Sequence, residues 1–161
     1  MGNEFLYSEL SSGFSPSKHP ARSDFNTGDL CQQRSKPPVT YSDVVGVLVW
    51  IIGFLFEAVG DYQLRRFIGN PLNKGRIMMS GLWRFTRHPN YFGEVVLWWG
   101  IFLIALSVPG GWRTIVGPAT ITFLILKVSG IPMLEAKYRS NPQYEAYQRR
   151  TSSFVPLPPR L

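Results

Sequence analysis

Gly81-Leu-Trp-Arg-Phe-Thr-Arg-His-Pro-Asn-Tyr-Phe-Gly-Glu94 is the most informative part of the sequence, because it leads directly into a long apolar segment. Pro89 suits the first turn of a helix, since its φ is fixed near the helical value and its missing N–H would be unpaired there. The residues from Asn90 to Val108 are almost all apolar, and Pro109-Gly110-Gly111 ends them. We therefore expect a membrane helix that begins at this motif.

Three side chains that carry or can carry positive charge stand at the start of this helix. Arg84, Arg87 and His88 lie where the helix dipole already places partial positive charge, so a negative group among them is expected. Backbone N–H groups, the dipole and the guanidinium groups would together hold a phosphate or carboxylate. The alternative is a basic cluster beside the membrane that contacts lipid headgroups and sets orientation.

Two further apolar segments flank the motif in sequence. The first runs from Val44 to Val59, with Ser42 or Asp43 as its expected cap. The other runs from Thr114 to Ser129, and Gly117-Pro118 predicts a kink inside it. Five tryptophans, eleven phenylalanines and few charges within the segments argue against buried helices of a soluble domain. The predicted fold is all-α, an integral membrane protein with about three transmembrane helices.

Composition narrows the class of protein further. The 161 residues carry a net charge of +7, and the basic residues flank apolar segments, which favours a lipid bilayer over nucleic acid as the partner. Cys31 is the single cysteine, and His19 and His88 are far apart, so we expect no disulfide and no metal site. Residues 1–40 are rich in serine, proline and charge and lack a signal-peptide pattern, which predicts a disordered segment before a membrane domain at 41–161.

The loops predict an orientation. Residues 61–88 carry six basic residues against the single acid Asp61, whereas the turn after the second segment holds only Arg113. The tail is also basic. The positive-inside rule therefore places the 61–88 loop and the C-terminus in the cytosol, so that the arginine motif and the tail meet on one face of a multi-pass protein.

The tail itself is expected to form short cytosolic helices. Asn141-Pro142 predicts a new helix, with Asn141 as its cap and Pro142 in its first turn. The tail tyrosines Tyr138, Tyr144 and Tyr147 suit either interfacial anchoring or contact with a ligand. Arg160, near the chain end, is expected to be exposed and to have no part in binding.

Three blocks of sequence resemble the C-terminal half of the steroid 5α-reductase-like membrane family, and above all its DUF1295 branch. They are Asn73-Lys-Gly-Arg-Ile77, the 81–94 motif, and Leu134-Glu-Ala-Lys-Tyr138 through Tyr144-Glu-Ala-Tyr147 to Phe154-Val-Pro. The resemblance covers about residues 42–161 and implies a cytosol-facing cofactor pocket lined by the motif and the tail. Residues that it assigns to the cofactor are Trp83, Arg87, His88, Asn90, Tyr91, Lys137, Tyr138, Tyr144 and Tyr147.

The resemblance leaves two chemistries open. Sterol and steroid reductases use NADPH to reduce a carbon–carbon double bond in a lipophilic substrate, whereas isoprenylcysteine carboxyl methyltransferases use S-adenosylmethionine. The charge pattern favours NADPH, because several phosphate groups explain the basic cluster better than one carboxylate does. That cluster is Lys74, Arg76, Arg84 and Arg87. With S-adenosylmethionine, carboxylates such as Glu94 or Glu135 would hold the cationic groups.

Two residues are the candidates for catalysis. Tyr91 is the best donor to polarise a substrate carbonyl, and Glu94 matches an acid that follows the motif in the reductases. An ionisable group within a membrane helix is costly and is a functional candidate by default, although Glu94 could instead neutralise Arg84 or Arg87. Glu57 and Asp61 are the other acids near the expected pocket.

Full-length relatives carry several membrane helices before the position of Ser42, where this chain has a polar stretch. A truncated membrane protein without catalysis is therefore a third alternative. The location follows from the organism, the endoplasmic reticulum in a eukaryote or the inner membrane in a bacterium. Substrate identity and oligomeric state lie beyond the sequence.

Overall fold

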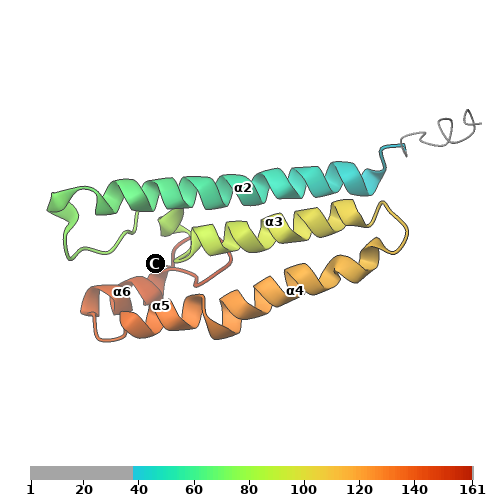
Figure 1. Ribbon diagram of the computed structural model, residues 1–161. Coiled ribbons are helices and arrows are strands. Elements are labelled where there is room, and N and C mark those ends of the chain that lie inside the picture. The colour runs from blue at the N-terminus through green and yellow to red at the C-terminus, as the bar shows by residue number, and fades with distance from the viewer. Residues whose placement is uncertain (1–37, 161) are drawn as a thin grey trace, which may run out of the picture. The chain divides into compact units, whose positions relative to one another are not determined.

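The structure is a computed structural model that describes residues 38–160. These residues form a bundle of helices (Figure 1). Contacts divide the chain into Met1–Pro38 and Val39–Leu161, and all the described helices belong to the second unit. The predicted disorder of residues 1–40 falls almost wholly outside the described residues. The helical elements are α2 (Tyr41–Ile68), η1 (Pro71–Asn73), η2 (Gly81–Arg84), α3 (Pro89–Ala105), η3 (Gly111–Ile115), α4 (Val116–Phe123), η4 (Leu124–Val128), α5 (Ile131–Lys137) and α6 (Pro142–Arg150).

Helix α2 starts earlier and ends later than its apolar residues predict. Its cap is Thr40, and the predicted caps Ser42 and Asp43 lie inside the helix. The Thr40 backbone N–H donates to Asp43 Oδ2 at 2.8 Å, which completes a reciprocal capping box. The helix continues past Val59 because residues 61–68 contain neither proline nor glycine to stop it.

Glycines spaced seven residues apart bring α2 and α3 into close contact. Gly46, Gly53 and Gly60 are the buried residues of α2. Gly46 faces Gly100 of α3, Gly53 faces Gly93, and Gly60 faces the start of α3. A Cβ atom on Gly100 would lie 2.6 Å from the Trp50 backbone nitrogen, which is closer than van der Waals contact allows. Small residues of this kind let membrane helices pack backbone to backbone.

Helix α3 begins at Pro89, which confirms the predicted start at the motif. It ends at Ala105, before the predicted end at Val108. The turn that follows contains Gly110 with a φ of 80°, a left-handed conformation that favours glycine.

The third apolar segment is not a uniform α-helix. Its first part is the 3₁₀ helix η3, which passes into α4 at Val116, directly before Gly117-Pro118. Its last part is the π-helical stretch η4, which Ser129 follows. The segment is therefore irregular on both sides of α4, and the kink at Gly117-Pro118 stays a prediction.

Two stretches of helix are long and apolar enough to cross a membrane. They are Tyr41–Ile68 and Gly111–Lys137, with mean hydropathies of 2.0 and 1.6, and their apolar windows are only 17% and 22% buried. Core helices of a soluble protein would be mostly buried, so the exposure confirms an all-α membrane protein. At 17 residues, α3 is at the lower limit for a span of about 17 to 25 residues, and the three-span arrangement stays a prediction.

Candidate functional site

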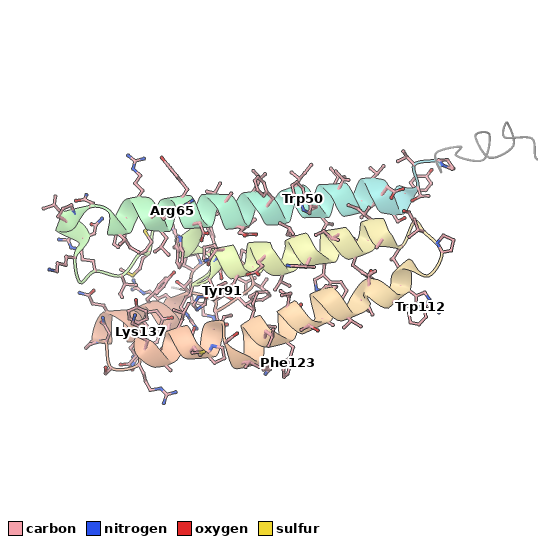
Figure 2. All side chains as sticks on the ribbon, in the orientation of Figure 1. Trp50, Arg65, Tyr91, Trp112, Phe123 and Lys137 are labelled. Carbon is pink, nitrogen blue, oxygen red and sulfur yellow. The ribbon has the colours of Figure 1, made fainter. Side chains whose placement is uncertain are left out.

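The site lies at one end of the bundle, where the arginine motif, α5, α6 and the chain end meet. Figure 2 shows Arg65 and Lys137 toward this end and Trp112 at the other. The two basic segments of the sequence thus belong to the same end, which confirms that the motif and the tail share a face. Among the described residues, Arg113 is the basic residue at the far end.

The C-terminal segment holds the motif through its backbone. Thr86, which is fully buried, donates its hydroxyl to the Phe154 carbonyl at 2.8 Å. The Arg87 backbone N–H donates to the Ser152 carbonyl at 2.9 Å, and the Leu157 N–H donates to the Phe85 carbonyl at 2.9 Å. The tail therefore fixes residues 85–88, which come directly before the start of α3.

Arg87 is buried, and protein groups occupy all three nitrogens of its guanidinium. Nε and Nη2 donate to Glu135 Oε1 at 3.0 and 2.6 Å. Nη1 donates to the Gln148 and Thr151 carbonyls at 3.1 and 2.6 Å. Arg87 therefore connects the start of α3 to α5 and α6. The alternative in which Glu94 neutralises Arg87 is wrong, because Glu135 is its partner.

His88 is 4% exposed, and its Nε2 atom has no hydrogen-bond partner among the described residues. That atom lies 3.5 Å from Glu135 Oε1, and the imidazole stacks on Tyr91 with ring centroids 5.6 Å apart. Burial lowers the pKa of His88, against the opposing effect of Glu135. The imidazole is therefore neutral at pH 7 and has one ring nitrogen free to bond a ligand.

Asn90 links α3 to α2 and also keeps a polar atom free. Its Nδ2 donates to Asp61 Oδ1 at 3.0 Å, while its Oδ1 is buried without a partner among the described residues. Buried polar atoms normally have partners, so His88 and Asn90 together mark a place where a ligand is expected.

Trp83 and the tail tyrosines form the aromatic wall. The indole Nε1 of Trp83 donates to the Gly60 carbonyl at 3.1 Å, and the Tyr147 hydroxyl donates to the Trp83 carbonyl. Tyr144 packs on Tyr138 with centroids 5.2 Å apart. Burial raises the pKa of Tyr144 to about 12 and raises that of Tyr147 as well. Both phenols therefore stay protonated and can only donate or accept hydrogen bonds.

These side chains surround a cavity of about 210 Å³. The predicted residues that line it are Arg76, Trp83, Arg87, His88, Asn90, Tyr138, Tyr144 and Tyr147. Sequence reasoning missed the apolar part of the wall, which is Leu64, Phe67, Ile68, Ile77, Met78 and Leu134. Apolar residues in a membrane protein carry no signal that separates a ligand-lining position from a lipid-facing one.

A wider groove of about 1100 Å³ adjoins this cavity, because both are lined by Phe67, Arg76, Ile77 and Tyr147. Its basic residues are Arg76, Arg84, Arg150 and Arg160, and none of them forms an ion pair within residues 38–160. Within residues 38–160, no carboxylate side chain lines either space. Arg160 is exposed as expected and borders this groove. That Arg160 has no part in binding stays a prediction, which the position of this residue disfavours.

Five predicted residues do not line the cavity or the groove. Lys74 is exposed on the loop after η1, Lys137 is exposed at the end of α5, and Glu94 lies one turn along α3. Glu135 forms an ion pair with Arg87, which lines the cavity, and so Glu135 contributes indirectly by holding that side chain. Tyr91 packs against the cluster of Val95, Ile125 and Ile131, and Figure 2 shows it at the start of α3. It approaches the cavity through its stacking on His88.

Comparison with known proteins gives the family. The family model described as "Protein of unknown function (DUF1295)" matches residues 29–151, more than half of the chain. The 3-oxo-5-alpha-steroid 4-dehydrogenase 1 of Bos taurus is 36% identical over 84 residues, which are 52% of this chain and 30% of the relative. The human protein of the same name is 34% identical over 68 residues, 42% of this chain and 26% of that one.

A second kind of relative also matches. The probable O-methyltransferase ustE of Ustilaginoidea virens is 37% identical over 46 residues, 29% of this chain and 16% of that protein. The chain thus spans under a third of the length of these curated relatives. No solved structure matches. The matched segment, the motif and the helical architecture agree, and the chain belongs to the steroid 5α-reductase-like DUF1295 family.

Proposed function

We propose that the chain forms the cofactor-binding part of a membrane oxidoreductase that uses NADPH to reduce a carbon–carbon double bond in a lipophilic substrate. The observation that carries the proposal is a narrow cavity with two unpartnered polar atoms, joined to a groove lined by four arginines. The matches to proteins named steroid dehydrogenases support the same class of reaction.

The groove suits the phosphate groups of such a cofactor. Arg76, Arg84, Arg150 and Arg160 offer guanidinium groups with no ion-pair partner among the described residues, and these bind phosphate oxygens in pairs of parallel hydrogen bonds. Arg87, which was also expected to contact the cofactor, lines the cavity and fixes α5 and the tail around it.

The cavity suits a carboxamide such as that of nicotinamide. Asn90 Oδ1 can only accept a hydrogen bond, whereas the neutral imidazole of His88 can donate one from Nε2. A primary carboxamide offers the complementary N–H and carbonyl groups. Tyr144 and Tyr147 remain protonated and close the other side of the cavity.

When bound, NADPH supplies the hydride for the reduction. The residues of this chain bind and orient the reactants, and proton supply to the neighbouring carbon falls to polar groups at the start of α3. We assign polarisation of the substrate carbonyl to the hydroxyl of Tyr91, which stacks on His88, with Glu94 one turn further along α3. Exclusion of water by the buried Trp83, Thr86 and Pro89 suits such a transfer.

We place the protein as a multi-pass membrane protein with the 61–88 loop and the C-terminus in the cytosol. Both basic segments lie at the end of the bundle that carries the site, which supports the positive-inside orientation. The membrane would be that of the endoplasmic reticulum in a eukaryote or the inner membrane in a bacterium, and the lipophilic substrate would come from the bilayer.

A methyltransferase that uses S-adenosylmethionine is the second candidate, favoured by the match to a probable O-methyltransferase. Its cofactor carries a sulfonium and an ammonium group, which call for carboxylates in the wall. Among the described residues, no carboxylate side chain lines the cavity or the groove, and Glu135 is already paired with Arg87. The charges therefore favour NADPH.

Binding measurements on the detergent-solubilised protein test the proposal. NADPH should bind, and its affinity should fall with added salt because screening acts over about 8 to 10 Å at moderate ionic strength. S-adenosylmethionine should bind far more weakly. Tight, salt-insensitive binding of S-adenosylmethionine would support the methyltransferase, and binding of neither cofactor would leave a truncated membrane protein without catalysis.

A further inference from the structure

A further hollow of about 640 Å³ lies between the last turns of α2 and the loop that ends at Gly81. It shares Phe67, Asn73 and Ser80 with the groove and Phe67 and Met78 with the cavity, so it adjoins the cofactor site. The residues that line the hollow alone are Val59, Tyr62, Gln63, Arg66, Asn70 and Gly81. No acidic residue of the described part of the chain lines it. Changes at these residues therefore test the hollow without altering the lining of the cavity or the groove.

The hollow offers free hydrogen-bond donors. Arg66 is exposed and forms no ion pair or side-chain hydrogen bond within residues 38–160. Tyr62 is 57% exposed, and the Asn70 side chain uses only its oxygen, which accepts from the Leu72 N–H at 3.0 Å. A guanidinium, a phenol and an amide N–H₂ therefore point to an anionic, oxygen-rich ligand.

Tyr62 and Arg66 also end a row of apolar residues along the outer face of α2. Leu48, Ile52, Leu55 and Val59 precede them at spacings of three or four, which places all six on one face of the helix. Leu48, Ile52 and Leu55 are each at least half exposed. The row thus runs from an apolar surface to a phenol and then to a positive charge. This order complements an anionic phospholipid, whose acyl chains are apolar and whose phosphate is negatively charged.

The depth of this hollow fits the headgroup layer. Helix α2 has 28 residues, which is about 42 Å at 1.5 Å per residue. A hydrocarbon core of about 30 Å takes roughly 20 of them. Counted from Tyr41, the core ends near Gly60, so Tyr62 and Arg66 lie among the headgroups.

We propose that the outer face of α2 binds an anionic phospholipid, with its phosphate at Arg66 and Asn70 and an acyl chain along Leu55 and Val59. The inference rests on the membrane placement of α2 and not on the reductase activity. Loss of the lipid site would therefore leave cofactor binding at Arg76 and Arg84 intact.

Native mass spectrometry of the detergent-purified full chain tests this, with phosphatidylglycerol and phosphatidylcholine as the probes. The key variant is Arg66→Gln, and Arg65→Gln is its matched control, because Arg65 carries the same charge on the same turn but lines none of the three spaces. We expect one retained phosphatidylglycerol, an affinity about tenfold lower in Arg66→Gln, and a change within about twofold in Arg65→Gln.

Thermal unfolding gives a second measurement if lipid is lost in the spectrometer. Phosphatidylglycerol should raise the midpoint of the wild type and of Arg65→Gln but not that of Arg66→Gln. Should Arg66→Gln fail to fold, Arg66→Ala and Arg66→Lys replace it, and only the lysine should retain the response. Equal effects of Arg65→Gln and Arg66→Gln, or equal retention of phosphatidylcholine, would overturn the proposal.

Discussion

Arg87 Nη2 lies 2.6 Å from Glu135 Oε1, so a residue two positions before the start of α3 is paired with one from α5. The side chains are 9% and 22% exposed, which makes this a largely buried pair. The same guanidinium bonds two carbonyls at the end of α6 and just beyond it. One side chain therefore joins the motif, α5 and the start of the C-terminal segment.

Arg87→Ala should release the C-terminal segment and destabilise the fold. Removing one member of a buried ion pair typically costs about 3 to 5 kcal/mol, because the other charge is left without compensation. Limited proteolysis should cut within residues 150–160, and the unfolding midpoint in detergent should fall. Arg149→Ala is the control, since Arg149 is 76% exposed and pairs only with Glu145. An intact tail in Arg87→Ala would contradict this role.

Gly100→Ala should force α2 and α3 apart. Its Cβ atom would lie 2.6 Å from the Trp50 nitrogen, so overpacking should cost about 1 to 3 kcal/mol. Gly117→Ala is the matched control, because its nearest neighbour would be a Trp98 ring atom at an ordinary 3.7 Å. Thermal unfolding of both variants in one detergent measures the difference, and similar midpoints would show that the glycine contact is not required.

Local rules for helix starts and caps predicted much of the fold from the sequence. Pro89 at the start of α3 and Asn141 as cap of α6 follow from backbone preferences, and the structure confirms both. The Asn141 side chain accepts from the Gln143 N–H at 2.9 Å. The cap at Thr40 was missed because two good capping residues, Ser42 and Asp43, follow it closely.

The tertiary partners of the site residues were less predictable. Charge at a helix start suggested that Arg87 binds an external anion, whereas its partner in the structure is Glu135. Because Glu135 lies 48 positions away in sequence, no local pattern predicts that pairing. The arginines of the groove, Arg150 and Arg160, lie in a tail whose path depends on its backbone hydrogen bonds with Phe85 and Arg87.

Tags at two positions test the topology. A cysteine-accessibility tag near Asn70 should report the cytosol, because six basic residues lie in the 61–88 loop, and one near Gly110 should report the opposite side. The tag near Gly110 lies in the turn after α3. Labelling of both from one side would exclude a membrane-crossing α3.

The stability of the protein should fall in mild acid because of His88. Burial lowers the pKa of His88 below its unfolded value of about 6.5, so the unfolded chain binds the proton more tightly. This contribution is complete above about pH 6.5 and is lost as the pH falls through the folded pKa. Glu135, Arg87 and Tyr91 surround the imidazole, and Glu135 moderates the loss.

Unfolding midpoints at pH 7.5 and 5.5 measure this effect, with His88→Gln beside the wild type. The glutamine removes the titrating group while keeping polar atoms in the wall, so its midpoint should change less between the two pH values. A wild type and a variant with identical pH responses would show that other groups govern the acid sensitivity.

Arginines of the groove should decide cofactor affinity. Arg84→Gln should weaken NADPH binding by about 1.5 to 3 kcal/mol, or roughly 10- to 150-fold, because a charge-assisted hydrogen bond is lost. Arg150→Gln should act in the same direction, since both residues line the groove.

Arg139→Gln is the control, because Arg139 is exposed and borders none of the cavities described above. Isothermal titration at low and high salt measures both the loss and the reduced salt dependence that each removed charge should produce. Equal losses in Arg84→Gln and Arg139→Gln would mean that general positive charge, and not the groove, attracts the cofactor.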